Sequence, residues 1–113
     1  MYYYQTNSNA APFISDVYSD FIEAPTAMLA LKQVVAEYKH PCGLYAAVIQ
    51  SESKQKTLAR FISMYAIATE KARKMSEGGL HRKGDMFRIF KKGGHHWIPL
   101  KDLATEDKWE DLE

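Results

Sequence analysis

Two adjacent glycines, Gly93-Gly94, constrain the fold of this chain more than any other local feature. Apolar-rich runs flank them on both sides, and such runs around a Gly-Gly pair predict a β-hairpin with a two-residue turn. In this register the predicted pairs are Lys92 with His95, Phe90 with Trp97, Arg88 with Pro99, Ile89 with Ile98, and Phe87 with Leu100. The Ile89 face of the hairpin is predicted to be core. The opposite face combines aromatic with basic side chains.

Two segments before residue 50 show further patterns. Residues 25–39 carry apolar side chains at three- and four-residue steps, which predicts a helix that begins near Pro25 and ends before His40-Pro41. The apolar run from Leu44 to Ile49 is short and bounded by turn residues, which favours a buried strand. The same apolar residues also fit one face of a helix.

The segment from Phe13 to Ile22 is more ambiguous. Its apolar residues recur at four-residue steps, as in a helix, but they are aromatic and β-branched, as in a strand. A strand here would complete a strand-helix-strand unit with residues 44–49, and this interpretation is favoured.

A second and longer helix is predicted over Lys54 to Met75. Apolar residues such as Leu58, Phe61 and Tyr65 fall on one helical face, and the Gly78-containing stretch after Met75 ends the helix. The acidic residues from 101 onward are expected to make one or two helical turns or to stay unfolded.

The predicted fold class is α+β, with a small sheet, two helices packed on one of its faces, and the element order β-α-β-α-β-β. A mainly helical chain with a C-terminal β-hairpin is the alternative, because the runs at 13–22 and 44–49 also fit helices. The length of 113 residues fits one domain. We place that domain at residues 1–103 and an acidic C-terminal tail at residues 104–113.

The composition, with 46% hydrophobic and 26% charged residues, is typical of a soluble globular protein. No apolar run approaches the roughly 18 residues that a membrane span needs, and the N-terminus lacks the charged start and apolar stretch of a signal peptide. A single cysteine, Cys42, cannot form an internal disulfide, which agrees with a reducing compartment. These features predict a cytoplasmic protein without a membrane partner.

The net charge of +1 conceals an uneven distribution along the chain. Residues 50–96 carry eleven basic and four acidic side chains, a net charge of +7, whereas residues 1–49 and 97–113 carry −2 and −4. An anionic partner is therefore expected on the middle block. The competing interpretation is that these charges only solvate the outside of one helix and one hairpin.

Signatures of catalysis are nearly absent. The chain has no Gly-x-Ser-x-Gly, no phosphate-cradling Gly-x-x-x-x-Gly-Lys-Ser/Thr, no Gly-x-Gly-x-x-Gly and no His-Glu-x-x-His. The residue types that zinc prefers are present as His40, Cys42, His81, His95 and His96, but their spacing matches no standard site. We therefore predict no metal, no cofactor and no catalytic residue. A lone cysteine beside a turn, such as Cys42, is usually a buried packing residue, although a contact with the His40 side chain could lower the pKa of its thiol.

The candidate binding surface joins two groups of residues. Opposite the apolar face of the predicted long helix lie Lys56, Arg60, Lys71 and Lys74. On the second face of the predicted hairpin lie Arg88, Phe90, Lys92, His95 and Trp97. Aromatic rings beside cationic groups suit stacking on nucleobases and charge pairing with phosphates. The competing interpretation is a sheet buried on both sides, in which a helix covers Phe90 and Trp97.

These features favour a non-enzymatic binding protein whose surface over residues 54–97 holds an anionic partner, either nucleic acid or a phosphorylated small molecule. The main alternative is a protein-interaction module, an inhibitor or adaptor, that uses the same aromatic residues as anchors for a protein partner. A small enzyme with an unrecognised site is a third alternative. A homo-oligomer is compatible with each function. The acidic tail has the sign needed to compete with an anionic partner for the basic block.

Overall fold

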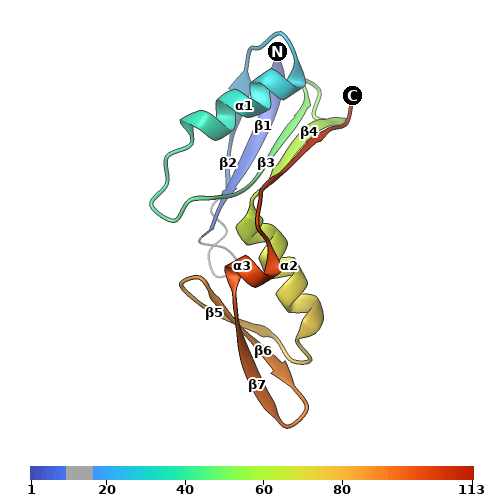
Figure 1. Ribbon diagram of the computed structural model, residues 1–113. Helices are drawn as coiled ribbons and strands as arrows, with labels where there is room; N and C mark the ends of the chain where they lie inside the picture. Colours follow the sequence, from blue (N-terminus) through green and yellow to red (C-terminus); the bar gives the residue numbers. More distant parts are fainter. Residues whose placement is uncertain (10–16) are drawn as a thin grey trace. The chain divides into compact units, whose positions relative to one another are not determined.

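The structure is a computed structural model that describes residues 1–9 and 17–113. Its residue contacts divide into two compact units (Figure 1). Unit 1 comprises Met1–Ser63 and Lys108–Glu113, and unit 2 comprises Met64–Asp107. The chain therefore leaves unit 1 after residue 63, forms unit 2, and returns to unit 1 for its last six residues.

Unit 1 is a five-stranded antiparallel sheet with one helix. Its elements are β1 (Tyr2–Ser8), β2 (Val17–Ile22), α1 (Ala27–Glu37), β3 (Leu44–Ser51), β4 (Thr57–Ile62) and β8 (Lys108–Asp111). The strand order is β2-β1-β3-β4-β8, so β1 lies between the two strands that flank α1 in the chain. The strands predicted within 13–22 and at 44–49 are confirmed as β2 and β3, although residues 13–16 lie outside the described residues. The predicted strand-helix-strand unit exists with an additional strand at its centre.

Helix α1 confirms the helix predicted over residues 25–39, and local chemistry defines its start. Thr26 is the N-cap, and its hydroxyl accepts a hydrogen bond of 3.2 Å from the Leu29 N–H. Leu31 and Val34 of α1 pack on the sheet against buried Ile49 of β3. Small alanines in α1, β3 and β4 let the helix approach the sheet closely, and they complete the core of unit 1.

Unit 2 places two helices on one face of a three-stranded antiparallel sheet. Its elements are α2 (Met64–Met75), β5 (Leu80–Lys83), β6 (Met86–Lys91), β7 (Gly94–Pro99) and the short α3 (Leu100–Leu103), with strand order β5-β6-β7. Phe87 and Ile89 of β6 are fully buried because they pack in one cluster with Ala68 and Ala72 of α2 and with Leu103 of α3.

The predicted long helix over 54–75 is wrong. Residues Thr57–Ile62 form β4, and only Met64–Met75 form helix α2. Leu58 and Phe61 have a spacing that also fits a helix, but β4 pairs with β3 on one side and with β8 on the other. Over so short a segment, hydrogen bonding to two neighbouring strands outweighs a helical apolar pattern.

The predicted fold class is wrong in its layout and in its order of elements. The described chain is 44% strand and 25% helix, with eight strands in two antiparallel sheets and three helices. It is a mostly-sheet α+β structure, which also contradicts the mainly helical alternative. The predicted order lacked β1, β4, β5 and β8. None of the helices in the described residues has the length and the apolar character that crossing a membrane requires.

The C-terminal segment contains the helical turn α3, which was one of the two alternatives that the sequence indicated, and also a strand, which the sequence did not indicate. Strand β8 pairs antiparallel with β4, and the Trp109 ring packs edge-to-face on Phe61 with 4.8 Å between centroids. Arg60 Nη2 donates to Glu110 Oε2 at 2.8 Å. The division into a domain at residues 1–103 and a tail at residues 104–113 stays a prediction.

The predicted hairpin exists, but its turn comes one residue earlier. Strands β6 and β7 pair with Lys91 opposite Gly94, so the turn residues are Lys92 and Gly93, and Gly93 adopts a positive φ of 89°. Compared with the prediction, each β6 residue meets a β7 residue two positions nearer the turn. A shift of two keeps every side chain on its predicted face. The prediction that the Ile89 face is core is therefore confirmed despite the wrong register.

Candidate functional site

The face of the unit 2 sheet opposite its helices is open and carries aromatic and basic side chains. His81 of β5, Arg88 of β6 and Trp97 of β7 are directly paired and form one row across the sheet. Phe90 and His95 form the next row. Both helices of unit 2 pack on the other face. Trp97 is 41% exposed, so within the described residues of unit 2 no helix covers its ring.

Arg88 is the centre of this open face. Its guanidinium carbon lies 5.1 Å from the centroid of the Phe90 ring and 5.9 Å from that of the Trp97 ring. Its Nη2 lies 3.2 Å from Nδ1 of His95. Because a guanidinium has no acceptor, Nδ1 of His95 is the acceptor of this hydrogen bond. Two rings and one imidazole thus hold the guanidinium in a defined orientation.

Hydrogen bonds join the two ends of strand β6 to the residues that follow α2 and to the start of α3. The Phe90 N–H donates to Ser76 Oγ at 2.9 Å, and the Phe90 carbonyl accepts a hydrogen bond of 2.7 Å from the Glu77 N–H. At the other end of β6, the Leu100 N–H that begins α3 donates to the Asp85 carbonyl at 2.8 Å. These hydrogen bonds anchor both ends of the strand that carries Arg88 and Phe90 on the open face.

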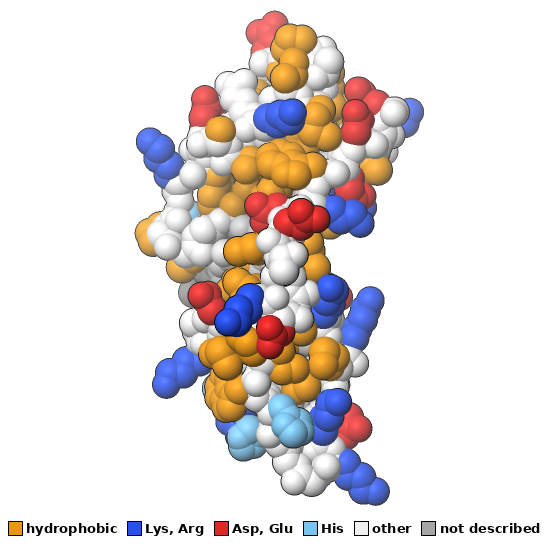
Figure 2. All heavy atoms as spheres, in the orientation of Figure 1, with side chains coloured by type: hydrophobic (Ala, Val, Ile, Leu, Met, Phe, Trp, Pro, Cys, Tyr) orange, Lys and Arg blue, Asp and Glu red, His pale blue; other side chains and the backbone are white. Residues whose placement is uncertain are grey.

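Positive charge concentrates in the strands that carry this face. Residues 80–99 have five basic side chains, one acidic side chain and three histidines. Unit 2 as a whole carries a net charge of +3 and unit 1 a net charge of −2, with histidines neutral. Figure 2 shows hydrophobic, basic and histidine side chains beside one another on the part of unit 2 that faces the viewer. The field around unit 2 is thus suited to an anionic partner.

The sequence-predicted site residues divide between the two units. Those of the hairpin stay together: Arg88, Phe90, His95 and Trp97 lie on the open face and Lys92 in the turn at its end. Those of the predicted long helix are split: Lys71 and Lys74 are exposed on α2, whereas Lys56 and Arg60 belong to unit 1. The helix that was expected to align these four residues does not exist. Arg60 is engaged by Glu110, so we leave it out of the candidate site.

Sequence reasoning missed the contribution of β5 to the open face. His81 lies opposite Arg88, and Lys83 lies opposite Met86. A signal was available, because Gly-Asp between two runs is a recognised two-residue hairpin turn, and Gly84 adopts a positive φ of 57°. Strand β5 was hidden because its four residues, Leu-His-Arg-Lys, contain only one apolar side chain.

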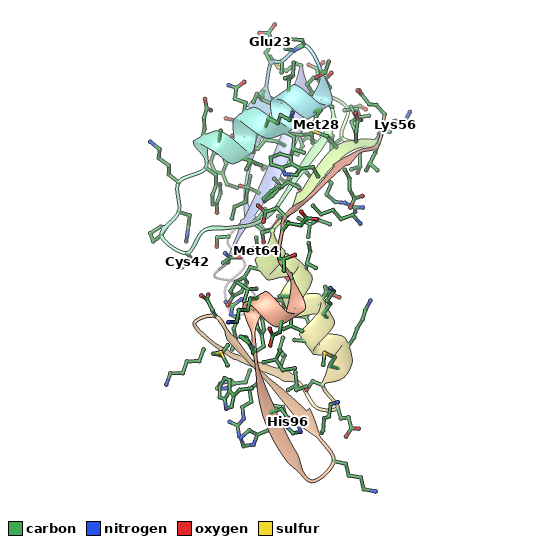
Figure 3. The ribbon with its side chains drawn as sticks, viewed as in Figure 1. Glu23, Met28, Cys42, Lys56, Met64 and His96 are labelled. Carbon is green, nitrogen blue, oxygen red and sulfur yellow. The ribbon has the colours of Figure 1, made fainter. Side chains whose placement is uncertain are left out.

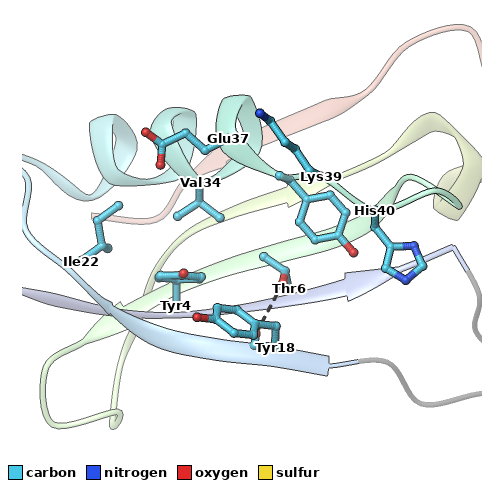
Figure 4. Close-up of a pocket in the computed structure, with 9 residues that line it drawn as sticks. Tyr4, Thr6, Tyr18, Ile22, Val34, Glu37, Lys39 and His40 are labelled. Carbon is cyan, nitrogen blue, oxygen red and sulfur yellow. Dashed lines mark hydrogen bonds between the residues drawn. The ribbon is translucent and has the colours of Figure 1, made fainter.

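Unit 1 contains a pocket of about 450 Å³ between α1 and strands β1 and β2 (Figure 4). Ile22 and Val34 give it an apolar lining, and its aromatic lining comes from Tyr4, Tyr18, Tyr38 and His40. Thr6, Glu37 and Lys39 are the remaining lining residues. The ring centroids of Tyr4 and Tyr18 are 6.1 Å apart, and those of the stacked Tyr38 and His40 rings are 6.3 Å apart.

The environment of the Tyr4 hydroxyl is desolvated and negative. Burial raises the pKa of Tyr4, and the neighbouring Tyr18 and the carboxylates of Asp20 and Glu37 raise it further. The phenol of Tyr4 is therefore neutral at physiological pH.

Cys42 is exposed, which contradicts the buried packing role expected from the sequence. It lies in the loop between α1 and β3 (Figure 3). Its backbone N–H donates to Nδ1 of His40 at 3.0 Å. Among the described residues, no group of three or more His, Cys, Asp or Glu side chains is placed to hold a metal ion.

Comparisons with known proteins find no relative for this chain: no protein-family model, no curated protein and no solved structure matches it. The function is therefore inferred from the geometry and the charge of the two sites described above.

Proposed function

We propose that this chain binds single-stranded nucleic acid through the open face of the unit 2 sheet. The observation that supports this proposal is the Arg88 guanidinium beside the rings of Phe90 and Trp97, on an exposed sheet face that also carries Lys83. Aromatic side chains stack on bases of any sequence, and cationic side chains neutralise the phosphates between them.

The shape of the face favours a strand over a small phosphorylated ligand. Sites for small molecules are concave and enclose most of the ligand surface. Here the aromatic and basic groups are spread along a sheet surface, from Lys83 at one end of β6 to Lys92 at the other. Exposed bases of a single strand can reach Trp97 without leaving a duplex stack.

The two tryptophans of the chain provide a matched test. Trp97 lies on the open face, whereas Trp109 packs on Phe61 in unit 1. We expect Trp97→Ala to weaken binding of a fluorescently labelled oligothymidylate by about tenfold in an anisotropy titration, since stacking contributes ~1–3 kcal/mol per base. Trp109→Ala should leave the affinity within about twofold. In a Trp109→Phe protein, oligonucleotide binding should quench the fluorescence of Trp97 directly.

Salt dependence separates the proposed function from its alternatives. Each phosphate contact should give a slope of about −0.7 in a plot of log K against log salt for a single strand. Binding that depends on Trp97 but not on salt would contradict the nucleic-acid proposal. It would instead support the protein-interaction alternative. That alternative is favoured by Met86 of β6 and Trp97 of β7, which are large apolar side chains exposed on neighbouring strands. Equal affinity for free nucleotide and oligonucleotide would indicate a small phosphorylated ligand.

A further inference from the structure

We propose that the pocket of unit 1 binds a small organic cation, a trimethylammonium group, in a cage of tyrosine side chains beside the Glu37 carboxylate. Every residue that lines this pocket belongs to unit 1, whereas the proposed nucleic-acid surface belongs to unit 2. The two proposals can therefore fail independently.

The aromatic lining is the first observation that points to a cation. Tyrosines reach the pocket from three separate segments: Tyr4 from β1, Tyr18 from β2 and Tyr38 from the residue after α1. The Tyr4 and Tyr18 rings are tilted by 41° rather than stacked face to face, so their faces remain available on the pocket side. Figure 4 shows both rings on the sheet side of the pocket, opposite α1. Aromatic faces attract cations within about 6 Å.

The electrostatic potential is the second observation. The pKa of Tyr4 is raised, first by burial and then by neighbours that include the Asp20 and Glu37 carboxylates. These carboxylates therefore place negative potential at the Tyr4 hydroxyl. Lys39 is the opposing charge in the lining, and both Glu37 and Lys39 are exposed.

The apolar lining decides which cation fits. Val34 is almost fully buried and Ile22 is half-buried, and both line the pocket. N-methyl groups can pack on such side chains, whereas a bare ammonium would lose its hydration without gaining hydrogen bonds there. A volume of about 450 Å³ exceeds that of one trimethylammonium group, so the chain that carries it can enter as well. Free quaternary amines and the trimethylated lysine of a peptide share this chemistry.

The test is a titration of the full chain with tetramethylammonium chloride, followed by two-dimensional NMR of the backbone amides at matched chloride concentration. We expect saturable shifts at Thr6 and Tyr18. The neutral isostere tert-butanol should give none at the same concentrations. Saturation by both compounds with equal affinity would show an apolar pocket without cation recognition and would overturn the proposal, as would the absence of saturable shifts with tetramethylammonium.

Variants assign the binding to the cage. Tyr18→Leu and Glu37→Gln should each weaken tetramethylammonium binding at least fivefold, because they remove a ring face and the opposing charge. Tyr18→Phe keeps the ring and should stay within twofold of the original affinity, which separates recognition from loss of folding. Glu23→Gln, which changes an exposed carboxylate just before α1, is the matched charge control. Unchanged affinity in Tyr18→Leu would overturn the proposal.

A second titration distinguishes the two sources of the ligand group. Choline represents a free quaternary amine, and a short peptide with trimethyllysine represents a modified protein. Tighter binding of the peptide than of choline, with at least tenfold weaker binding of the same peptide with unmodified lysine, would assign a methylated protein segment. The opposite ranking would assign a free amine. Equal binding of modified and unmodified peptide would contradict the cage.

Discussion

Lys54 is the one non-glycine residue of the described chain with a positive φ, at 66°. It closes the turn between β3 and β4, where its N–H donates to the Ser51 carbonyl at 2.8 Å. Its ammonium lies 4.4 Å from the Tyr3 ring centroid, a cation–π contact. A left-handed conformation costs an L-residue about 1–2 kcal/mol. We expect Lys54→Gly to be more stable than Lys54→Ala by ~1 kcal/mol in urea denaturation, since both lose the contact and only glycine relieves the strain.

Lys56 provides the control for this comparison. It lies in the same connection, is exposed, and has no positive φ. At Lys56 the order should reverse, with Ala more stable than Gly by about 0.5 kcal/mol, because glycine loses more backbone entropy on folding. Equal stability of the Ala and Gly variants at position 54 would contradict the left-handed conformation of Lys54.

Glu110 makes stability depend on pH at the edge of unit 1. The hydrogen bond from Arg60 lowers the pKa of Glu110 below its usual 4.5. Partial desolvation raises this pKa, whereas the positive charges of Arg60 and Lys108 lower it further. A carboxyl whose pKa is lower in the folded state stabilises the fold above the unfolded-state pKa, and this contribution is lost as the pH falls through the folded-state pKa. Glu110→Gln should therefore lower the melting temperature at pH 7, and the difference from the original chain should be smaller at pH 3.

The exposed neighbour Glu113 is the control for this experiment. Its substitution, Glu113→Gln, should leave the melting temperature nearly unchanged at both pH values, because exposed charges contribute little to folding. A melting-temperature difference between Glu110→Gln and the original chain that is equally large at pH 3 would mean that the carboxylate is not the source of the effect. Added salt should narrow the difference at pH 7.

At the scale of elements, the register of the β6–β7 hairpin is testable through its glycines. Gly93 adopts a positive φ, whereas Gly94 does not and pairs with Lys91 as a strand residue. Gly93→Ala should therefore destabilise the chain by ~1 kcal/mol more than Gly94→Ala, measured by thermal or urea denaturation. A Gly93-Gly94 turn of the kind indicated by the sequence would require special backbone conformations at both positions. Equal costs of the two substitutions would support that turn instead.

The elements that could be predicted from the sequence are those with local signals. The capped helix α1, the apolar strand β3 and the Gly93 hairpin each carry one, and the alternation in β6 placed Arg88 on its true face even with the wrong register. Strand β4 could not be predicted locally, because its pattern fits a helix and one of its two partner strands, β8, lies almost fifty residues later. For the same reason the predicted alignment of Lys56 with Lys71 was wrong, while the hairpin part of the site remained together.

Strand β2 is an edge strand, and one acidic side chain partly protects it from pairing with another chain. It lies at the end of the unit 1 sheet and exposes Val17, Tyr18 and Phe21. Asp20 Oδ1 accepts a hydrogen bond of 2.7 Å from the Phe21 N–H, and its charge disfavours pairing with another chain. We expect Asp20→Ala to increase concentration-dependent self-association in sedimentation experiments, since it removes both effects. Glu23→Ala, which removes an equal charge outside the strand, should not. Equal self-association of the two variants would indicate a nonspecific charge effect.

At the scale of the whole molecule, the path of the chain allows the two units to be separated. Lys108 of β8 is directly paired with Ile62 of β4, so unit 2 occupies the place of a hairpin loop in the sequence of unit 1. Within unit 2, the Met64 N–H donates to Asp107 Oδ1 at 2.8 Å, which holds its two ends together. Each unit also has its own hydrophobic core. These are the features of a unit that can be inserted or removed with little strain.

Replacement of Met64–Asp107 by Asn-Gly tests this organisation. The new loop, Ser63-Asn-Gly, has the length of a common three-residue hairpin connection. We expect the shortened chain to fold cooperatively, with dispersed amide NMR signals and a single urea transition, to keep tetramethylammonium binding, and to lose oligonucleotide binding. The excised unit 2, close to the size of about 40 residues below which domains rarely fold alone, should be less stable than the shortened chain. A shortened chain that does not fold would show that the two units form one cooperative domain, because unit 1 would then depend on unit 2 for stability.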